Sequence, residues 1–256
     1  MSATHIRFIL ALALLAVGAP AKAADENGFF SRFERADKTR WYVSNGWANG
    51  DHQGCEWRAE EVRYENSRVQ LGLSDRWATK RPYACAEIQT HKRSGYGLYE
   101  ARLRTAAGSG LNTGFFTYVG PPLGVPEWDE IDFEFLGKDP GTVDINYWTN
   151  GKTQLGKKIQ LGFDASRDFH NYAFDWSPTG IRYYADGKLI YETPPDAKIP
   201  HNPGKLFLTL WSGAKAQDDW MGPFQYKGPV SAEVEWAAYT PPNAPCQFPE
   251  SLKCKQ

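Results

Sequence analysis

The chain has 256 residues, and its 29 basic side chains nearly balance its 30 acidic ones, for a formal net charge of −1. This balance creates no strong field that would attract nucleic acid or an anionic membrane, so we expect neither nucleic acid nor a stable membrane association. Dividing the length by a typical domain size suggests more than one domain, but all-β domains of this length often form a single unit.

The first 23 residues have the pattern of a secretory signal peptide. A weakly basic start precedes an apolar run over residues 8–17, and Ala-Lys-Ala at 21–23 supplies a small-residue cleavage site. An apolar run of about ten residues is too short for a membrane-spanning helix. We therefore expect residues 1–23 to be removed and the mature chain to be secreted as a soluble protein.

Four cysteines, Cys55, Cys85, Cys246 and Cys254, allow three pairings. Export to an oxidising compartment makes disulfides the default state of these thiols. Their spacing contains no C-x-x-C pair, so a zinc site is not expected. The most economical pairing joins residue 55 to 85 and residue 246 to 254, and the second bridge then closes a short loop in a proline-rich tail.

Short segments typical of β-strands follow one another along the chain. In order they are YGLYEARLR (96–104), TGFFTYV (113–119), VDINYWT (143–149), NYAFDWS (171–177), GIRYYADGKLIYE (180–192), LFLTLW (206–211) and AEVEWAAY (232–239). Asp186-Gly187 is a strong hairpin signal, and only AEEVRYEN (59–66) resembles a helix. The pattern predicts an all-β sandwich or jelly roll. Residues 241–256 differ in composition and are interpreted as an appended, disulfide-pinned tail.

Five of the ten tryptophans lie beside polar or turn residues and not within apolar runs: Trp47, Trp128, Trp148, Trp211 and Trp220. An exposed indole face stacks on a sugar ring, because a pyranose presents an apolar C–H face. The alternative is that these side chains belong to the core of a β-sandwich. The sequence favours the sugar-stacking interpretation but leaves both open.

The segment PEWDEIDFEFLG (126–137) places five acids within eight positions. In a strand, successive side chains point to opposite faces, so Ile131, Phe133 and Phe135 share one face. The alternating residues Glu130, Asp132 and Glu134 share the opposite face of the strand. A helix would bring 130 and 134 together but would scatter the apolar residues, so the alternation favours a strand with a column of three carboxylates.

A solvated surface strand would mix charges and hydroxyls, because stacked acids repel one another. A calcium or magnesium site would use such acids, although calcium loops are irregular and also supply backbone carbonyls. Glycoside hydrolysis needs one ionised carboxylate and one protonated carboxyl group, and close placement separates their pKa values. Positions four apart on a flat strand are roughly 13 Å apart, whereas a retaining glycosidase needs about 5–5.5 Å. A curved strand is therefore expected.

EIDFE at 130–134 resembles the E-x-D-x-E signature of glycoside hydrolase family 16. The stretches 115–139, 161–178 and 218–222 are similar to bacterial lichenases, which are endo-β-1,3-1,4-glucanases. The resemblance covers nearly all of residues 24–240. The signal, the length and the cysteine-bearing tail resemble secreted rhizobial endoglycanases that trim succinoglycan-type exopolysaccharide. The resemblance implies a curved β-jelly-roll sandwich of two antiparallel sheets, with a concave cleft and retention of configuration.

By position, the resemblance implies that Glu130 is the nucleophile, Asp132 its helper and Glu134 the general acid/base. It also places Cys55 and Cys85 where lichenases have their disulfide. Six residues match cleft positions that hold glucose units: Asn49, Glu87, Trp128, Asn146, Trp211 and Trp220. Four cleft positions depart from the lichenase pattern: Gln89 replaces Arg, Thr209 replaces Asn, and Trp47 and Trp148 replace Tyr. The family often carries a structural calcium, whose place corresponds to Glu235; no cofactor is required.

We therefore expect a monomeric, secreted bacterial endo-β-1,3-1,4-glycanase of retaining mechanism. Its expected substrate is a glucose-rich polysaccharide, a succinoglycan-type exopolysaccharide. One alternative is a lichenase or β-1,3-glucanase that acts on undecorated β-glucan. Another is a non-catalytic carbohydrate-binding jelly roll, although a binding protein gains nothing from three stacked carboxylates.

Overall fold

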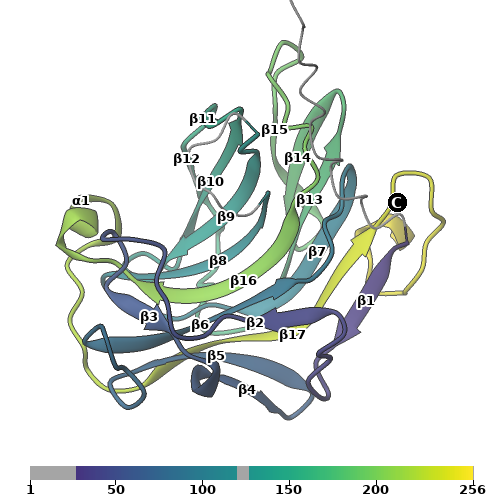
Figure 1. The fold of residues 1–256 in the computed structure, drawn as a ribbon. Helices are drawn as coiled ribbons and strands as arrows, with labels where there is room; N and C mark the ends of the chain where they lie inside the picture. The colour runs from purple at the N-terminus through teal and green to yellow at the C-terminus, as the bar shows by residue number, and fades with distance from the viewer. Residues whose placement is uncertain (1–26, 120–126, 256) are drawn as a thin grey trace, which may run out of the picture.

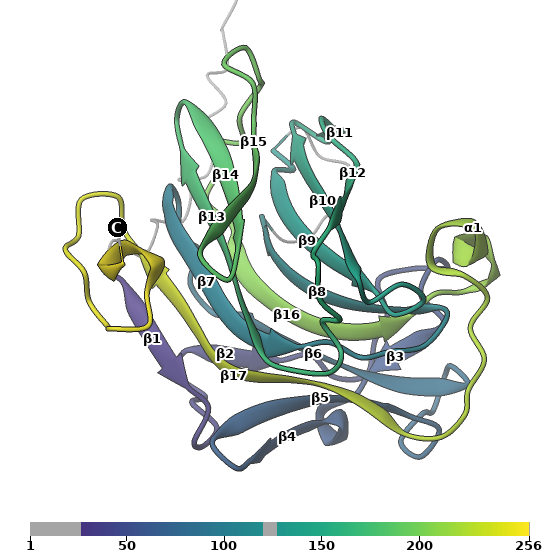
Figure 2. The same ribbon diagram turned by 180° about the vertical axis from the view of Figure 1, so that it is seen from behind.

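The computed structural model describes residues 27–119 and 127–255, so the predicted signal peptide lies outside the described residues. Two curved antiparallel sheets pack face to face, and Figures 1 and 2 show β8, β9 and β10 in one layer opposite β7, β13 and β14 in the other. The predicted jelly-roll sandwich is confirmed. Among the described residues, no helix is long and apolar enough to cross a membrane.

The first sheet contains the acidic strand. Its strands, from one edge to the other, are β12 (Lys157–Gln160), β10 (Thr142–Thr149), β9 (Glu130–Leu136), β8 (Leu111–Tyr118), β16 (Lys205–Ser212), β6 (Tyr83–Thr90) and β2 (Trp41–Val43), with the short β11 (Lys152–Thr153) also on β10. Figure 1 shows the bend of β16 along its length. The acidic strand is therefore central in a curved sheet.

The second sheet covers the apolar face of the first. Its strands are β15 (Lys188–Glu192), β14 (Gly180–Ala185), β13 (His170–Ser177), β7 (Gly97–Arg104), β17 (Val230–Thr240), β5 (Arg68–Ser74) and β4 (Val62–Glu65), with β1 (Phe29–Arg32) on β17 beyond the end of β5. The strand β3 (Cys55–Trp57) pairs parallel with β6, which also pairs with β5 and so joins the two sheets.

Helical structure is limited to α1 (Asp218–Met221) and the 3-10 turns η1 (Ala59–Glu61), η2 (Lys215–Gln217) and η3 (Leu252–Cys254) within the described chain. The segment 59–66, which resembles a helix in sequence, forms a single 3-10 turn followed by β4. Val62 and Tyr64 alternate there with exposed neighbours, and Asn66 and Ser67 adopt positive φ in a two-residue hairpin turn. The hairpin predicted at Asp186-Gly187 is confirmed.

The core lies between the sheets and is built by the alternation seen in the sequence. Ile131, Phe133 and Phe135 of β9 are at most 1% exposed. The Phe133 ring stacks on Phe115 of the same sheet and meets the edge of Tyr183 from the second sheet. Burying one face of β9 in this way fixes the strand register, because a slip of one residue would turn the acids into the core.

Both predicted disulfides are confirmed, Cys55–Cys85 and Cys246–Cys254. The second bridge lies in the tail after β17, which packs against the second sheet. Phe248 of the tail stacks on Phe30 of β1, and the buried Glu100 of β7 accepts hydrogen bonds from the Ser251 hydroxyl and the Leu252 N–H, both at 2.7 Å. The tail is thus docked by apolar and polar contacts as well as by its bridge.

Candidate active site

The acidic column lies on the face of β9 that points away from the core, here called the acidic face. On one side, β10 places a residue opposite each acid: Trp148 opposite Glu130, Asn146 opposite Asp132 and Asp144 opposite Glu134. On the other side, β8 places Tyr118 opposite Glu130, Phe116 opposite Asp132 and Gly114 opposite Glu134. A Cβ at Gly114 would lie 2.6 Å from the Thr209 hydroxyl of β16, so glycine lets this hydroxyl approach β8 closely.

The five acids of the 126–137 segment have different surroundings. Asp129 is buried and its carboxylate accepts backbone N–H groups from Asn150 at 2.9 Å, His201 at 2.7 Å and Asn202 at 2.9 Å. Glu127 is exposed. Asp129 therefore holds two loops in place, and only the three alternating acids are left for chemistry on the acidic face.

Direct hydrogen bonds orient the two outer acids. The Trp128 indole Nε1 donates to Glu130 Oε2 at 2.7 Å, and the Asn112 side-chain amide of β8 donates to Glu134 Oε1 at 3.2 Å. Asp132, which is 4% exposed, lies between them. Each outer acid thus has a neutral donor of its own, which stabilises its carboxylate form.

Burial and mutual repulsion separate the proton affinities of the three acids. Burial raises the pKa of Glu130 to about 7, opposed by hydrogen bonds from Trp128 and Asp132. Burial, with the charge of Glu130, raises the pKa of Glu134 to about 8. Burial and both neighbouring charges hold the pKa of Asp132 well above its ordinary value. The charge of Glu130 acts directly on Glu134, so ionisation of Glu130 favours retention of the proton on Glu134.

The five tryptophans singled out in the sequence are all partly exposed, unlike Trp41, Trp57 and Trp176 of the core. Two pairs flank the acidic face. Trp128 and Trp148 stack with ring centroids 4.9 Å apart and an interplanar angle of 6°, and Trp211 and Trp220 approach to 6.3 Å. Trp47, 38% exposed, stands on a loop against Trp57.

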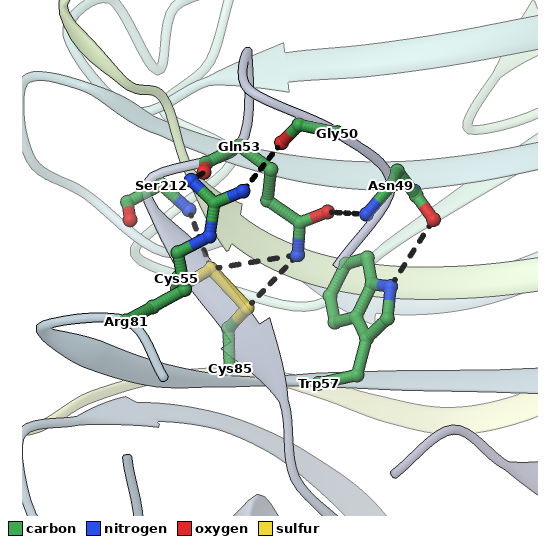
Figure 3. Close-up of a disulfide and its surroundings, with 8 residues drawn as sticks. All are labelled: Asn49, Gly50, Gln53, Cys55, Trp57, Arg81, Cys85 and Ser212. Carbon is green, nitrogen blue, oxygen red and sulfur yellow. Dashed lines mark hydrogen bonds between the residues drawn. A yellow bond between two sulfur atoms is a disulfide. The ribbon is translucent and has the colours of Figure 1, made fainter. Parts of the chain in front are cut away.

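The loop before β3 is held by polar contacts around the first disulfide (Figure 3). The Asn49 side-chain oxygen Oδ1 accepts the Trp57 indole N–H at 3.3 Å, and the Asn49 backbone N–H donates to Gln53 Oε1 at 2.9 Å. Gln53 Nε2 in turn lies 3.4 Å from the Cys85 sulfur. Asn49 is exposed, and these contacts fix the loop that carries it and Trp47.

Glu87, Gln89 and Lys205 form a polar chain across β6 and β16. Lys205 Nζ donates to Gln89 Oε1 at 2.7 Å, and Gln89 Nε2 donates to Glu87 Oε1 at 3.2 Å. The Ser44 hydroxyl donates to the same Glu87 oxygen at 2.5 Å. Burial raises the pKa of Glu87 to about 7. Thr209 lies opposite Glu87, and its buried hydroxyl has no protein partner among the described residues.

Asn146 completes the predicted set on β10. Its Oδ1 accepts a hydrogen bond from the Thr153 hydroxyl at 3.0 Å, and its side chain shares the acidic face with Asp132. Five of the predicted substrate-binding residues therefore lie in the same sheet as the acids: Asn146 and Trp148 on β10, Thr209 on β16, and Glu87 and Gln89 on β6.

The comparisons with known proteins bear on this geometry. Residues 49–238 match the family described as glycosyl hydrolases family 16. The chain belongs to this family. It is 43% identical over 227 residues to the endo-1,3-1,4-beta-glycanase ExoK of Rhizobium meliloti, covering 89% of this chain and 84% of the relative. It is 40% identical to the beta-glucanase of Bacillus subtilis, covering 90% and 93%.

A solved structure agrees with the family assignment. A prokaryotic β-1,3-1,4-glucanase (lichenase) derived from a mouse hindgut metagenome superposes with a TM-score of 0.78 at 40% identity, covering 84% of this chain and 99% of the other. This chain is therefore a glycoside hydrolase. The resemblance drawn from EIDFE is thereby confirmed.

The family's calcium does not fit the residue expected to bind it. The Glu235 carboxylate of β17 accepts a hydrogen bond from Arg102 Nε at 2.7 Å, so a guanidinium cation already neutralises it. In the described part of the chain, no group of three or more His, Cys, Asp or Glu side chains could hold a metal ion.

Sequence reasoning missed several side chains on or beside the acidic face: Asn112, Phe116, Tyr118, Asp144 and Lys205. One signal was present, because VDINYWT alternates and places Asp144 on the same face as Asn146 and Trp148. No comparable signal marks Tyr118 or Asn112, since the β8 sequence LNTGFFTY shows no regular alternation of polar and apolar residues. Their positions follow only from the pairing of β8 with β9.

Proposed function

We propose that this family 16 hydrolase is a secreted, monomeric endo-β-1,3-1,4-glycanase that retains anomeric configuration. Its substrate is a glucose-rich β-linked polysaccharide, a succinoglycan-type bacterial exopolysaccharide. Glu130 is the nucleophile, Asp132 its helper and Glu134 the general acid/base. Cleavage on sheet strands flanked by indole pairs suits an extended polymer that is bound along the acidic face and cut internally.

In the first step, the Glu130 carboxylate attacks the anomeric carbon while Glu134 gives its proton to the departing glycosidic oxygen. The C–O bond to the leaving sugar breaks, and an ester bond from Glu130 to the sugar forms. In the second step, Glu134 takes a proton from water, whose oxygen attacks the same carbon and releases Glu130. Two inversions leave the product in the β configuration.

The observation that carries this proposal is the ordered column of three acids on β9, of which Asp132 is buried and Glu130 and Glu134 are partly exposed. Glu130 accepts the Trp128 indole N–H, which lowers its pKa against the effect of burial and stabilises the carboxylate that a nucleophile requires. The pKa of Glu134 is held up by burial and the charge of Glu130, as an acid requires. A non-catalytic sugar-binding protein would gain nothing from stacking three carboxyl groups that repel one another.

Support for a decorated substrate comes from the residues beside the column. By the resemblance, lichenases carry Arg where this chain has Gln89 and Asn where it has Thr209. Gln89 Oε1 accepts a hydrogen bond from Lys205 Nζ, and the Thr209 hydroxyl has no hydrogen-bond partner among the described residues. The chemistry is thus kept while the groups that would contact sugars away from the cleaved bond have changed.

A digestion panel tests the proposed substrate. The enzyme is incubated with succinoglycan, lichenan and laminarin, and product masses and reducing ends are followed over time. We expect succinoglycan to give oligosaccharides early, with the largest kcat/KM of the three. Preference for lichenan would instead make the protein a lichenase, and preference for laminarin would make it a β-1,3-glucanase.

The double variant Gln89→Arg, Thr209→Asn should move specificity toward lichenan. Arg at position 89 would remove the acceptor of Lys205 and place a second cation beside Glu87. We expect the ratio of kcat/KM for lichenan to that for succinoglycan to rise about 10–100-fold, the discrimination that a pair of sugar contacts supplies. Gln70→Arg, on β5 of the second sheet, is the matched control. An unchanged ratio would show that these positions do not set substrate choice.

A further inference from the structure

Among the described residues, Asp144 is the acid outside the 126–137 segment that lies directly opposite Glu134. It lies opposite Glu134 in the β9–β10 ladder and opposite Lys158 in the β10–β12 ladder. Directly opposite residues have Cβ atoms about 4.5–5.5 Å apart. A row of one basic and two acidic side chains, Lys158, Asp144 and Glu134, therefore crosses the edge of the first sheet.

The two oxygens of Asp144 have different environments. Oδ2 accepts the Trp220 indole N–H at 3.0 Å. Oδ1 is buried without a hydrogen-bond partner among the described residues, and Lys158 Nζ stands 3.6 Å away. The Asp144 side chain is 19% exposed, against 44% for Lys158. Most of the Asp144 charge is thus directed at its neighbours on the acidic face, whereas the ammonium of Lys158 is screened by solvent.

Trp220 lies on α1, which belongs to the connection between β16 and β17 and not to the sheet. Its indole N–H donates to Asp144 Oδ2, and its ring centroid lies 6.3 Å from that of Trp211 on β16. Asp144 is consequently the link that fixes this indole relative to the strands carrying the acids.

We infer that Asp144 is a positioning residue with two tasks: its charge helps to keep the proton on Glu134, and its Oδ2 anchors the Trp220 indole beside the acidic face. The inference rests on the proposed role of Glu134 as the acid. It joins substrate binding to acid catalysis through a single side chain, since the residue that orients the indole also repels the conjugate base of the acid.

Other groups act on Glu134 as well. The titratable groups that face it are Glu130 and Asp132 on its own strand and Asp144 on β10; β8 contributes the neutral Asn112. Burial and the charge of Glu130 have the largest effects on Glu134, and Asp144 adds to them in the same direction. Removing the charge of Asp144 should therefore lower the pH at which Glu134 loses its proton.

The variants Asp144→Asn and Asp144→Ala separate the two tasks. Asn keeps an acceptor for Trp220 and loses the charge; Ala loses both. In pH profiles of kcat/KM, which report the free enzyme, we expect the basic limb to move down by about 0.5–1 pH unit in both variants. Only Asp144→Ala should also raise KM for the polymer, by roughly 2–10-fold, the range expected for one aromatic contact.

Asp139→Asn is the matched control, because it removes one carboxylate charge from the turn that joins the same two strands. Its basic limb should stay in place. A limb that stays unchanged in Asp144→Asn would overturn the electrostatic task, and equal KM values for the Asn and Ala variants would overturn the anchoring task. Glu134→Ala, assayed in parallel with activated aryl glycosides, distinguishes these failures from a wrong assignment of the acid itself.

Discussion

Glu134→Ala is expected to lose roughly 10²–10⁴-fold in kcat on polysaccharide, because proton transfer to the leaving oxygen disappears. The loss should be much smaller on aryl glycosides whose phenolate leaves without a proton. In this variant the glycosyl-enzyme still forms on Glu130 but water is no longer deprotonated. Azide, which needs no general base, should then intercept the ester from the face that water uses and give a β-glycosyl azide.

Glu130→Ala should behave differently, since it removes the nucleophile and the covalent intermediate with it. It also vacates the space beside the Trp128 indole that donates to Glu130. Azide entering that space should attack a β-glycoside directly, with inversion, and give the α-glycosyl azide. NMR of the anomeric proton distinguishes the two products.

The matched control for both variants is Glu127→Ala, which removes the first acid of the same segment from an exposed position. Its activity should remain that of the wild type, and added azide should give no glycosyl azide. Interchanged azide products in the Glu130 and Glu134 variants would mean that the two roles are reversed. Full activity of either variant would remove that residue from the mechanism.

Cys55→Ala with Cys85→Ala should lower the free energy of unfolding by about 2–4 kcal/mol, because the bridge restrains a long stretch of the unfolded chain. The two cysteines are 30 residues apart and fully buried. The bridge also fastens β3, and the preceding loop with Asn49, to β6 (Figure 3). Denaturant unfolding under non-reducing conditions measures the loss.

Cys246→Ala with Cys254→Ala is the natural comparison for the first bridge. This pair spans only 8 residues, and the tail keeps its contacts through Phe248 and Glu100. We expect a smaller loss of stability and no change in kcat. A larger loss from the tail bridge than from the first bridge would contradict this account of how the fold is held.

The fold followed from patterns that are local in sequence. The alternation over 130–136 alone predicted a strand with Phe133 in the core and Glu134 outside, and burial of one face makes that register unavoidable. Aspartate and glycine at 186–187 predicted a hairpin because both adopt positive φ there. The segment 59–66 resembles a helix in sequence, but residues 62–65 form a strand because the hairpin pairing of β4 with β5 overrides the helical propensity.

The site was less predictable, because its neighbours come from pairings between distant segments. Asp129 and Glu130 are adjacent in the chain, yet the first caps two loops while the second lies on the acidic face. The hydrogen bond from the Trp220 indole to Asp144 joins residues that are 76 positions apart in the sequence. The polar chain from Lys205 to Glu87 depends on the order of β16 and β6 in the sheet. Single-strand patterns carry no information about such contacts.

The configuration of the first sugar released by the wild-type enzyme tests the central claim most directly. A polysaccharide substrate is digested in deuterated buffer, and proton NMR follows the new reducing-end anomeric signals before mutarotation equilibrates them. The double displacement on Glu130 predicts that the β-anomer rises first and the α-anomer follows only by mutarotation. An α-anomer that accumulates first would show a single inversion, and it would contradict a nucleophilic role for Glu130.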